Sequence, residues 1–265
     1  MKIPFTQVDA FADKPFAGNP AAVMPLEAWL DDAVLQAIAA ENNLAETAFI
    51  VPSSREDADY ELRWFTPAVE VALCGHATLA TGHALLSADK SLSRVRLATR
   101  KAGILSVARD GDCYLLGLPA WTVEPKPLPE IAAAMGGNPV ETHWREGGYV
   151  VLLYAHESEI RALTPDFRAL GSFGDILYIA TAPGADTDIV SRVFAPGAGI
   201  DEDPVTGSAH CLLTTFWSAR LGRDNFTAYQ ASARGGYLGC KLEGDRAILS
   251  GNCITVIEGS FTLPG

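Results

Sequence analysis

An internal duplication constrains this chain of 265 residues more than any other feature. Residues 46–51, ETAFIV, align with residues 175–180, DILYIA, at an offset of 175 − 46 = 129. The same offset aligns residues 63–67, RWFTP, with 192–196, RVFAP; after a three-residue insertion, 74–77, CGHA, aligns with 206–209, TGSA. Because the matches keep their order and spacing, they predict two halves of similar fold. Each half then has an acidic residue before an apolar strand, a strand ending F-x-P, and a glycine beginning an apolar helix.

The local patterns predict few helices and many short strands. Helices are expected at residues 33–42, 76–87, 129–135 and 208–220, with Gly136 and Gly222 as stop signals after two of them. Short β-rich apolar runs at 48–51, 60–65, 150–154, 176–180 and 247–250 predict strands. Four helices cannot alternate with so many strands. The class is therefore α+β, not a doubly wound parallel sheet.

The boundary between the halves is predicted by a proline-rich segment. Residues 119–129, PAWTVEPKPLP, contain four prolines, which remove strand hydrogen-bond donors and interrupt helices. We therefore expect a linker that begins at Pro119.

Composition excludes several classes of function. Twenty Lys and Arg against 32 Asp and Glu give a formal net charge of −12 with no basic block, so neither nucleic acid nor an anionic membrane is an expected partner. The longest weakly polar run, residues 69–88, is interrupted by polar residues, and the first residues lack the basic and apolar regions of a secretory signal. The expected location is cytoplasmic.

The cysteines and histidines predict no cofactor. Five scattered cysteines without a CxxC pair predict free thiols, and the histidines lack HxxxH or HExxH spacing. The sequence also lacks a P-loop or dinucleotide fingerprint. We therefore expect neither a metal nor an organic cofactor.

Two helix starts are candidate anion sites. Gly75-His76 and Gly207-Ser208 each begin an apolar helix, and the first backbone amides of a helix have no internal partner and attract anions. The alternative is that Ser208 only caps its helix and that His76 replaces a cap. Two related starts could instead hold one anionic ligand at the interface between the halves.

Three acidic residues lie near these helix starts in the sequence. Glu46 precedes an apolar strand with little nearby charge, which suits a general acid or base. Asp203 precedes the second helix start, whereas Glu70 resembles a solvated loop residue. The alternatives are a surface carboxylate for Glu46 and a turn or capping residue for Asp203.

Several segments together resemble the PhzF family of phenazine-biosynthesis isomerases. They follow the family's order along the chain: residues 8–11 (VDAF), 16–23 (FAGNPAAV), 42–49 (NNLAETAF), 63–67 (RWFTP), 74–80 (CGHATLA) and 203–209 (DPVTGSA). The resemblance implies the diaminopimelate-epimerase-like fold, with two pseudo-symmetric halves, each a strand barrel around a central helix, and the active site in the cleft between them. The first half would be residues 1–118, completed by a last strand at about 254–265, and the second half residues 119–253. It also implies a homodimer without a cofactor.

The resemblance further implies residue roles. Glu46 matches the acid and base that moves a proton between carbons of trans-2,3-dihydro-3-hydroxyanthranilate, and His76, Asp203 and Ser208 match polar residues lining that site. Asn19 belongs to a matched segment and is expected to bind substrate. Gly75 and Gly207 match the glycines whose neighbouring amides receive a substrate carboxylate.

Two alternatives remain open at this point. Epimerases of the same fold use one thiol from each half, placed just before each helix-starting glycine. Cys74 occupies the first of these positions but Thr206 the second, so two-thiol epimerisation is disfavoured. The other alternative is a non-catalytic ligand-binding protein on the same scaffold, because fold alone does not specify function.

Overall fold

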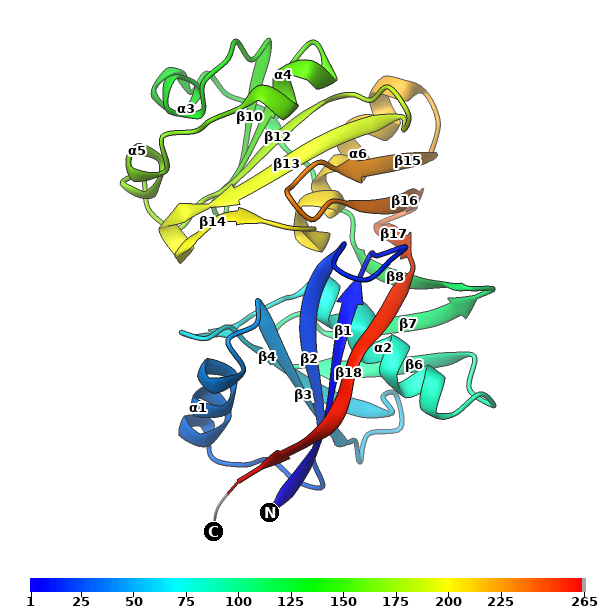
Figure 1. Cartoon of the computed structure of the whole chain (residues 1–265). Helices are drawn as coiled ribbons and strands as arrows, with labels where there is room; N and C mark the ends of the chain where they lie inside the picture. Colours follow the sequence, from blue (N-terminus) through cyan, green and yellow to red (C-terminus); the bar gives the residue numbers. More distant parts are fainter. Residues whose placement is uncertain (264–265) are drawn as a thin grey trace. The chain divides into compact units, whose positions relative to one another are not determined.

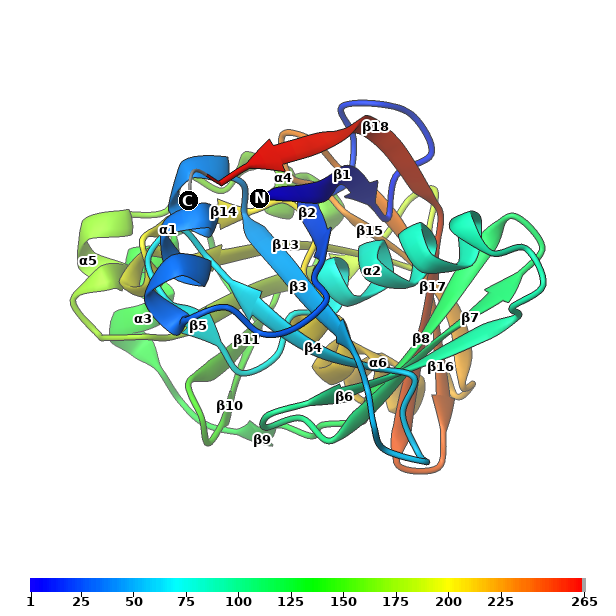
Figure 2. The same ribbon diagram turned by 90° about the horizontal axis from the view of Figure 1, so that it is seen from below.

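The computed structural model describes residues 1–263 and divides the chain into two compact units. The first unit is Met1–Leu118 together with the chain from Ile248 onward, and the second is Pro119–Ala247. Figure 1 colours the chain from its N-terminus to its C-terminus, and Figure 2 gives a second view of the same elements. No helix within residues 1–263 has both the length and the apolar character needed to cross a membrane.

The first unit is built mainly of strands. They are β1 (Lys2–Ala10), β2 (Asn19–Pro25), β3 (Glu46–Pro52), β4 (Tyr60–Phe65), β5 (Glu70–Val71), β6 (Arg94–Thr99), β7 (Ile104–Asp110), β8 (Cys113–Pro119), β17 (Arg246–Gly251) and β18 (Cys253–Thr262). The first residues of β17 belong to the second unit and the last residue of β8 does too. The helices are α1 (Asp32–Asn42) and α2 (Gly75–Ala88). The last strand, β18, pairs antiparallel with β1, so the end of the described chain returns to its beginning.

The second unit has the other strands and helices. The strands are β9 (Glu124–Pro125), β10 (Glu141–Arg145), β11 (Tyr149–Leu153), β12 (Leu177–Pro183), β13 (Ile189–Ala195), β14 (Ile200–Asp203), β15 (Asn225–Gln230) and β16 (Gly236–Glu243). The helices are α3 (Pro129–Met135), α4 (Glu157–Ala162), α5 (Phe167–Gly171) and α6 (Gly207–Leu221). All four predicted helices are confirmed. The short α4 and α5 were not predicted, because one or two turns give no clear hydrophobic period. Their local signals were Glu159, which accepts a hydrogen bond from the His156 N–H at the start of α4, and Asp166, which caps α5.

Strand pairing confirms the internal duplication. In the first unit β2 runs parallel to β3, β3 antiparallel to β4, and β4 antiparallel to β5 and parallel to β6. In the second unit β11, β12, β13, β14 and β15 repeat these relations in the same order. The long helix follows β5 in one unit and β14 in the other. The two units therefore share one topology.

The register corrects part of the sequence alignment. Thr47 lies opposite Phe65 in the first unit, and Tyr178 lies opposite Phe194 in the second. Since Phe65 and Phe194 are 129 residues apart, Thr47 corresponds to Tyr178, at an offset of 178 − 47 = 131. The counterpart of Glu46 is therefore Leu177, not the acidic Asp175. An acidic residue does precede the strand in both halves, but Asp175 lies two residues ahead of the position equivalent to Glu46. The difference arises because the β3–β4 connection is two residues longer than the β12–β13 connection.

Helix α2 is enclosed by strands of its own unit. It contacts β1, β2, β3, β6, β7 and β18, and both views show it beside β7 and β18 (Figure 1 and Figure 2). Its residues from Gly75 to Gly82 are all buried, as expected for a helix that is apolar nearly all round. In the second unit α6 is likewise buried along most of its length and contacts β16.

Gly82 allows α2 to pack closely on β7. A Cβ atom added at Gly82 would lie 2.3 Å from Cγ1 and 2.4 Å from Cβ of Val107. Gly82→Ala should therefore destabilise the protein by about 1–3 kcal/mol, although alanine is the better helix former. Urea unfolding measures the change. Shortening the opposing side chain in the double variant Gly82→Ala/Val107→Ala should recover part of the loss; a more stable single variant would contradict this packing.

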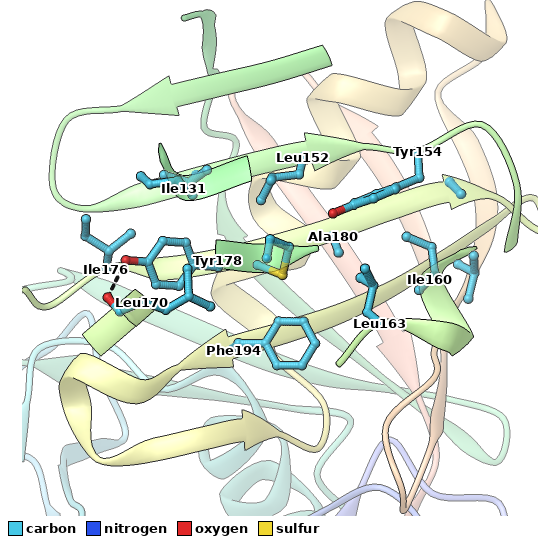
Figure 3. Close-up of a cluster of buried hydrophobic side chains, with 14 residues drawn as sticks. Ile131, Leu152, Tyr154, Ile160, Leu163, Leu170, Ile176, Tyr178, Ala180 and Phe194 are labelled. Carbon is cyan, nitrogen blue, oxygen red and sulfur yellow. Dashed lines mark hydrogen bonds between the residues drawn. The ribbon is translucent and has the colours of Figure 1, made fainter. Parts of the chain in front are cut away.

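The core of the second unit lies between its strands and the short helices α3, α4 and α5. Figure 3 shows aromatic and aliphatic side chains from these elements in contact, among them Tyr154, Tyr178 and Phe194. The Tyr178 hydroxyl donates to the Leu170 carbonyl at 2.8 Å, so this buried phenol has a partner. The cluster includes residues of β13, the strand with which β14 pairs.

Candidate active site

Three chain segments of the first unit bring the predicted residues Asn19, Glu46 and His76 together. Asn19 is the first residue of β2 and Glu46 the first residue of β3, and these strands run parallel, with Ala21 opposite Glu46. His76 is the second residue of α2, which packs against both strands. Asn19 and His76 are buried, and the Glu46 side chain is 12% exposed. The site thus forms where two strands and one helix begin.

The imidazole of His76 is held at both ring nitrogens. Nε2 lies 2.8 Å from Oε2 of Glu46, and Nδ1 lies 3.1 Å from Nδ2 of Asn19. The contact with Glu46 is short but not aligned as a hydrogen bond, so Oε2 is a buried acceptor without a well-placed donor. This carboxylate oxygen is therefore available to take a proton. Asn19 orients His76, a role that the sequence did not predict for it.

Burial and a neighbouring carboxylate act in opposite directions on the pKa of His76. Burial alone would lower the pKa of His76, but the Glu46 carboxylate beside Nε2 opposes burial, and the pKa is raised above its ordinary value.

Cys74 is a buried neutral thiol next to this pair. Its Sγ lies 3.5 Å from Nδ1 of His76, and burial, reinforced by the charge of Glu46, raises the pKa of Cys74 to about 11. A thiolate nucleophile or base is thus nearly absent at neutral pH. Glu46, Cys74 and His76 form the sole cluster of metal-ligand types within residues 1–263, with ligand atoms within 4.8 Å of one another. A metal there would have to displace the thiol proton and the contacts that occupy both ring nitrogens of His76.

A structural role for Cys74 leads to a test. Cys74→Ala should cost about 1 kcal/mol or more of stability, from the small cavity that it leaves, but should change turnover little. Alkylation of the native protein by iodoacetamide should be slow, because the thiol is buried and protonated. Mass spectrometry follows the modification. Rapid inactivation that substrate prevents would instead indicate a thiol mechanism.

In the second unit, the predicted Asp203, Gly207 and Ser208 lie at the end of β14 and the start of α6. The hydroxyl of Thr206 donates a hydrogen bond to Oδ2 of Asp203. Burial raises the pKa of Tyr149, and a hydrogen bond with Ser208 partly opposes that rise. For Asp203, Gly207 and Ser208, participation in the reaction remains a prediction.

Glu70 is not the solvated loop residue that the sequence suggested. It belongs to β5 and accepts two 2.8 Å hydrogen bonds from Arg63, whose side chain is only 3% exposed. Arg192 and Glu202 repeat this pair in the second unit at 2.7 and 3.0 Å. Because both halves have the pair, it stabilises the shared fold. The expectation failed because strand pairing, not local sequence, places Glu70 beside Arg63.

Two units of one topology, each with a buried helix beside its strands, and a buried carboxylate–imidazole pair at one helix start define an isomerase of the diaminopimelate-epimerase-like fold. A hydroxyproline epimerase from Agrobacterium vitis shares the fold alone: its TM-score is 0.64 at 14% identity, over 98% of this chain and 92% of that one.

Closer relatives identify the family. The family model described as "Phenazine biosynthesis-like protein" matches residues 8–259. A Pseudomonas aeruginosa protein named an uncharacterized isomerase is 46% identical over 265 residues, which cover 99% of this chain and all of the relative. A PhzF-family crystal structure from Enterococcus faecalis has a TM-score of 0.91 at 42% identity and covers 99% of this chain and all of that one. The chain belongs to the phenazine biosynthesis-like (PhzC-PhzF) family.

Proposed function

We propose that this isomerase moves a proton between two carbons of a small carboxylate-bearing substrate without a cofactor, with Glu46 as the proton carrier. The observation that best supports this proposal is the buried Oε2 of Glu46, 2.8 Å from Nε2 of His76 and without an aligned donor. The carboxylate accepts the proton from one carbon, the electron pair shifts through the conjugated substrate, and the same carboxyl group returns a proton at the other end.

A single proton carrier favours isomerisation over two-base epimerisation. The counterpart of Glu46 in the second unit is Leu177, and the counterpart of Cys74 is Thr206, so neither proton-accepting group is duplicated. Cys74 itself is a protonated thiol. A single carboxyl group removes and returns the proton on one face of the substrate, whereas epimerisation needs groups on opposite faces.

The substrate class rests on the family resemblance. The phenazine-forming members act on trans-2,3-dihydro-3-hydroxyanthranilate, and we propose a substrate of this kind: small, cyclic or conjugated, with a carboxylate. Asn19, His76, Asp203 and Ser208 are proposed site residues, and the amides near Gly75 and Gly207 the proposed carboxylate ligands. The proposed form is a cytoplasmic homodimer, which light scattering on the purified protein tests.

The decisive experiment is a screen of small amino and carboxylic acids in D2O, with mass spectrometry and NMR of the products. We expect deuterium at one carbon of an isomerised product, on the face from which the proton was removed. Some product should retain the original hydrogen, because a single buried carboxyl group can return the proton that it took. Inverted configuration at the labelled carbon would support epimerisation instead.

A further inference from the structure

Gln230, the last residue of β15, forms hydrogen bonds with both ends of the segment 203–206, which joins β14 to α6. It is 0% exposed, and its Oε1 accepts a hydrogen bond from the Thr206 backbone N–H at 2.9 Å. Its Nε2 donates to the Asp203 carbonyl at 2.6 Å and to the Thr206 hydroxyl at 3.2 Å. Both amide N–H groups and the amide oxygen are therefore used within the segment that leads into α6.

The direction of the hydrogen bonds is fixed by the chemistry of the partners. The Gln230 amide nitrogen can only donate, so the Thr206 hydroxyl oxygen accepts from it. The Thr206 hydroxyl proton is then free to be donated to Oδ2 of Asp203, which as a carboxylate only accepts. Each bond polarises the next, and the chain ends on the Asp203 carboxylate. Thr206 does not cap α6 with its side chain, which is used in this chain of bonds instead.

The duplicated fold shows that this network is not needed to form the half. Val193 pairs with Asp203 in the second unit, and its counterpart Trp64 pairs with Val71 in the first. Tyr60 and Ile189 are also counterparts, and they pair in parallel with Leu97 and Ala228. Leu97 therefore corresponds to Ala228, and Thr99, two residues further along, corresponds to Gln230. The first unit therefore builds the same strands and helix with Val71 and Thr99, without a carboxylate or a buried amide at these positions.

We infer that Gln230 and Thr206 are positioning residues that hold the Asp203 carboxylate in the orientation and charged state that the reaction needs. A polar network present in only one of two equivalent halves reflects a requirement of the site, since the shared fold forms without it. The inference rests on the proposed function, in which Asp203 is a site residue. It assigns to Thr206 the role of a hydrogen-bond donor. In a two-thiol epimerase the residue at this position would instead be a thiol that carries a proton.

The test compares Thr206→Val, which removes the donor, with Thr206→Ser, which keeps it, and adds Gln230→Met. NMR titration of the Asp203 carboxyl group is the first readout. Its midpoint should rise by about one pH unit or more in Thr206→Val and Gln230→Met, because a hydrogen bond to the charged form is lost. Thr206→Ser should stay near wild type. Thr99→Val, at the counterpart of Gln230, is the matched control and should leave the titration unchanged.

Turnover is the second readout. The kcat for proton exchange should fall at least about tenfold in Thr206→Val and recover in Thr206→Ser, with a smaller change in KM. Equal midpoints, or equal kcat, in the Val and Ser variants would overturn the inference. If no substrate shows exchange that depends on Glu46, the proposed function fails instead, and the NMR titration still decides whether Thr206 and Gln230 control Asp203. Should Gln230→Met not fold, the Val and Ser pair decides alone.

Discussion

Glu46→Gln should lower the rate of isomerisation and of deuterium exchange by roughly a hundred- to ten-thousand-fold. The amide keeps the size of the side chain and can still lie beside His76, but it cannot accept and return a proton. The melting temperature should stay within a few degrees, because the fold depends on strand pairing and on the enclosed helix, not on this side chain.

A matched control for this variant is Glu41→Gln. Glu41 lies on α1, and its side chain is exposed, so the same chemical change there should leave turnover at the wild-type level. NMR of His76 gives a second check, because the pKa of His76 should fall when the neighbouring carboxylate charge is removed. Unchanged exchange in Glu46→Gln would refute Glu46 as the proton carrier.

Acidification should destabilise the protein through His210, a buried histidine of α6. Burial lowers the pKa of His210 to about 4, while its Nδ1 lies 2.8 Å from the Thr206 carbonyl and its Nε2 has no partner. The folded pKa lies below the unfolded value of about 6.5, so the neutral ring stabilises the fold fully above pH about 6.5, and this contribution is lost as pH falls toward 4. A difference of about 2.5 units corresponds to about 3 kcal/mol.

Urea unfolding between pH 7 and pH 4 measures this loss. In His210→Asn, an amide can still donate to the Thr206 carbonyl but does not titrate. Between pH 7 and pH 4, the free energy of unfolding of this variant should therefore fall by about 3 kcal/mol less than that of the wild type. His156→Asn changes an exposed histidine and should keep the wild-type pH dependence. Equal pH dependence in His210→Asn and wild type would show that His210 is not the group responsible.

Much of the fold followed from the sequence because its signals are local or repeated. Apolar segments, with glycine stop signals after two of them, predicted all four longer helices, and the repeated R-x-F-[TA]-P and glycine motifs predicted two halves of one topology. The motif positions also predicted Glu46, His76 and Asn19, which the structure brings into contact in the first unit.

The tertiary structure decided what depends on strand register and on contacts between distant segments. Sequence similarity aligned Glu46 with Asp175, whereas backbone pairing makes Leu177 its counterpart and leaves a single carboxylate. Gln230 lies 27 residues beyond Asp203, and only the pairing of β15 with β13 brings its amide to that turn. The sequence by itself determined which elements form and which residue types can transfer a proton. The structure determined their partners, because hydrogen bonds across strands and to a helix start join residues that no local pattern relates.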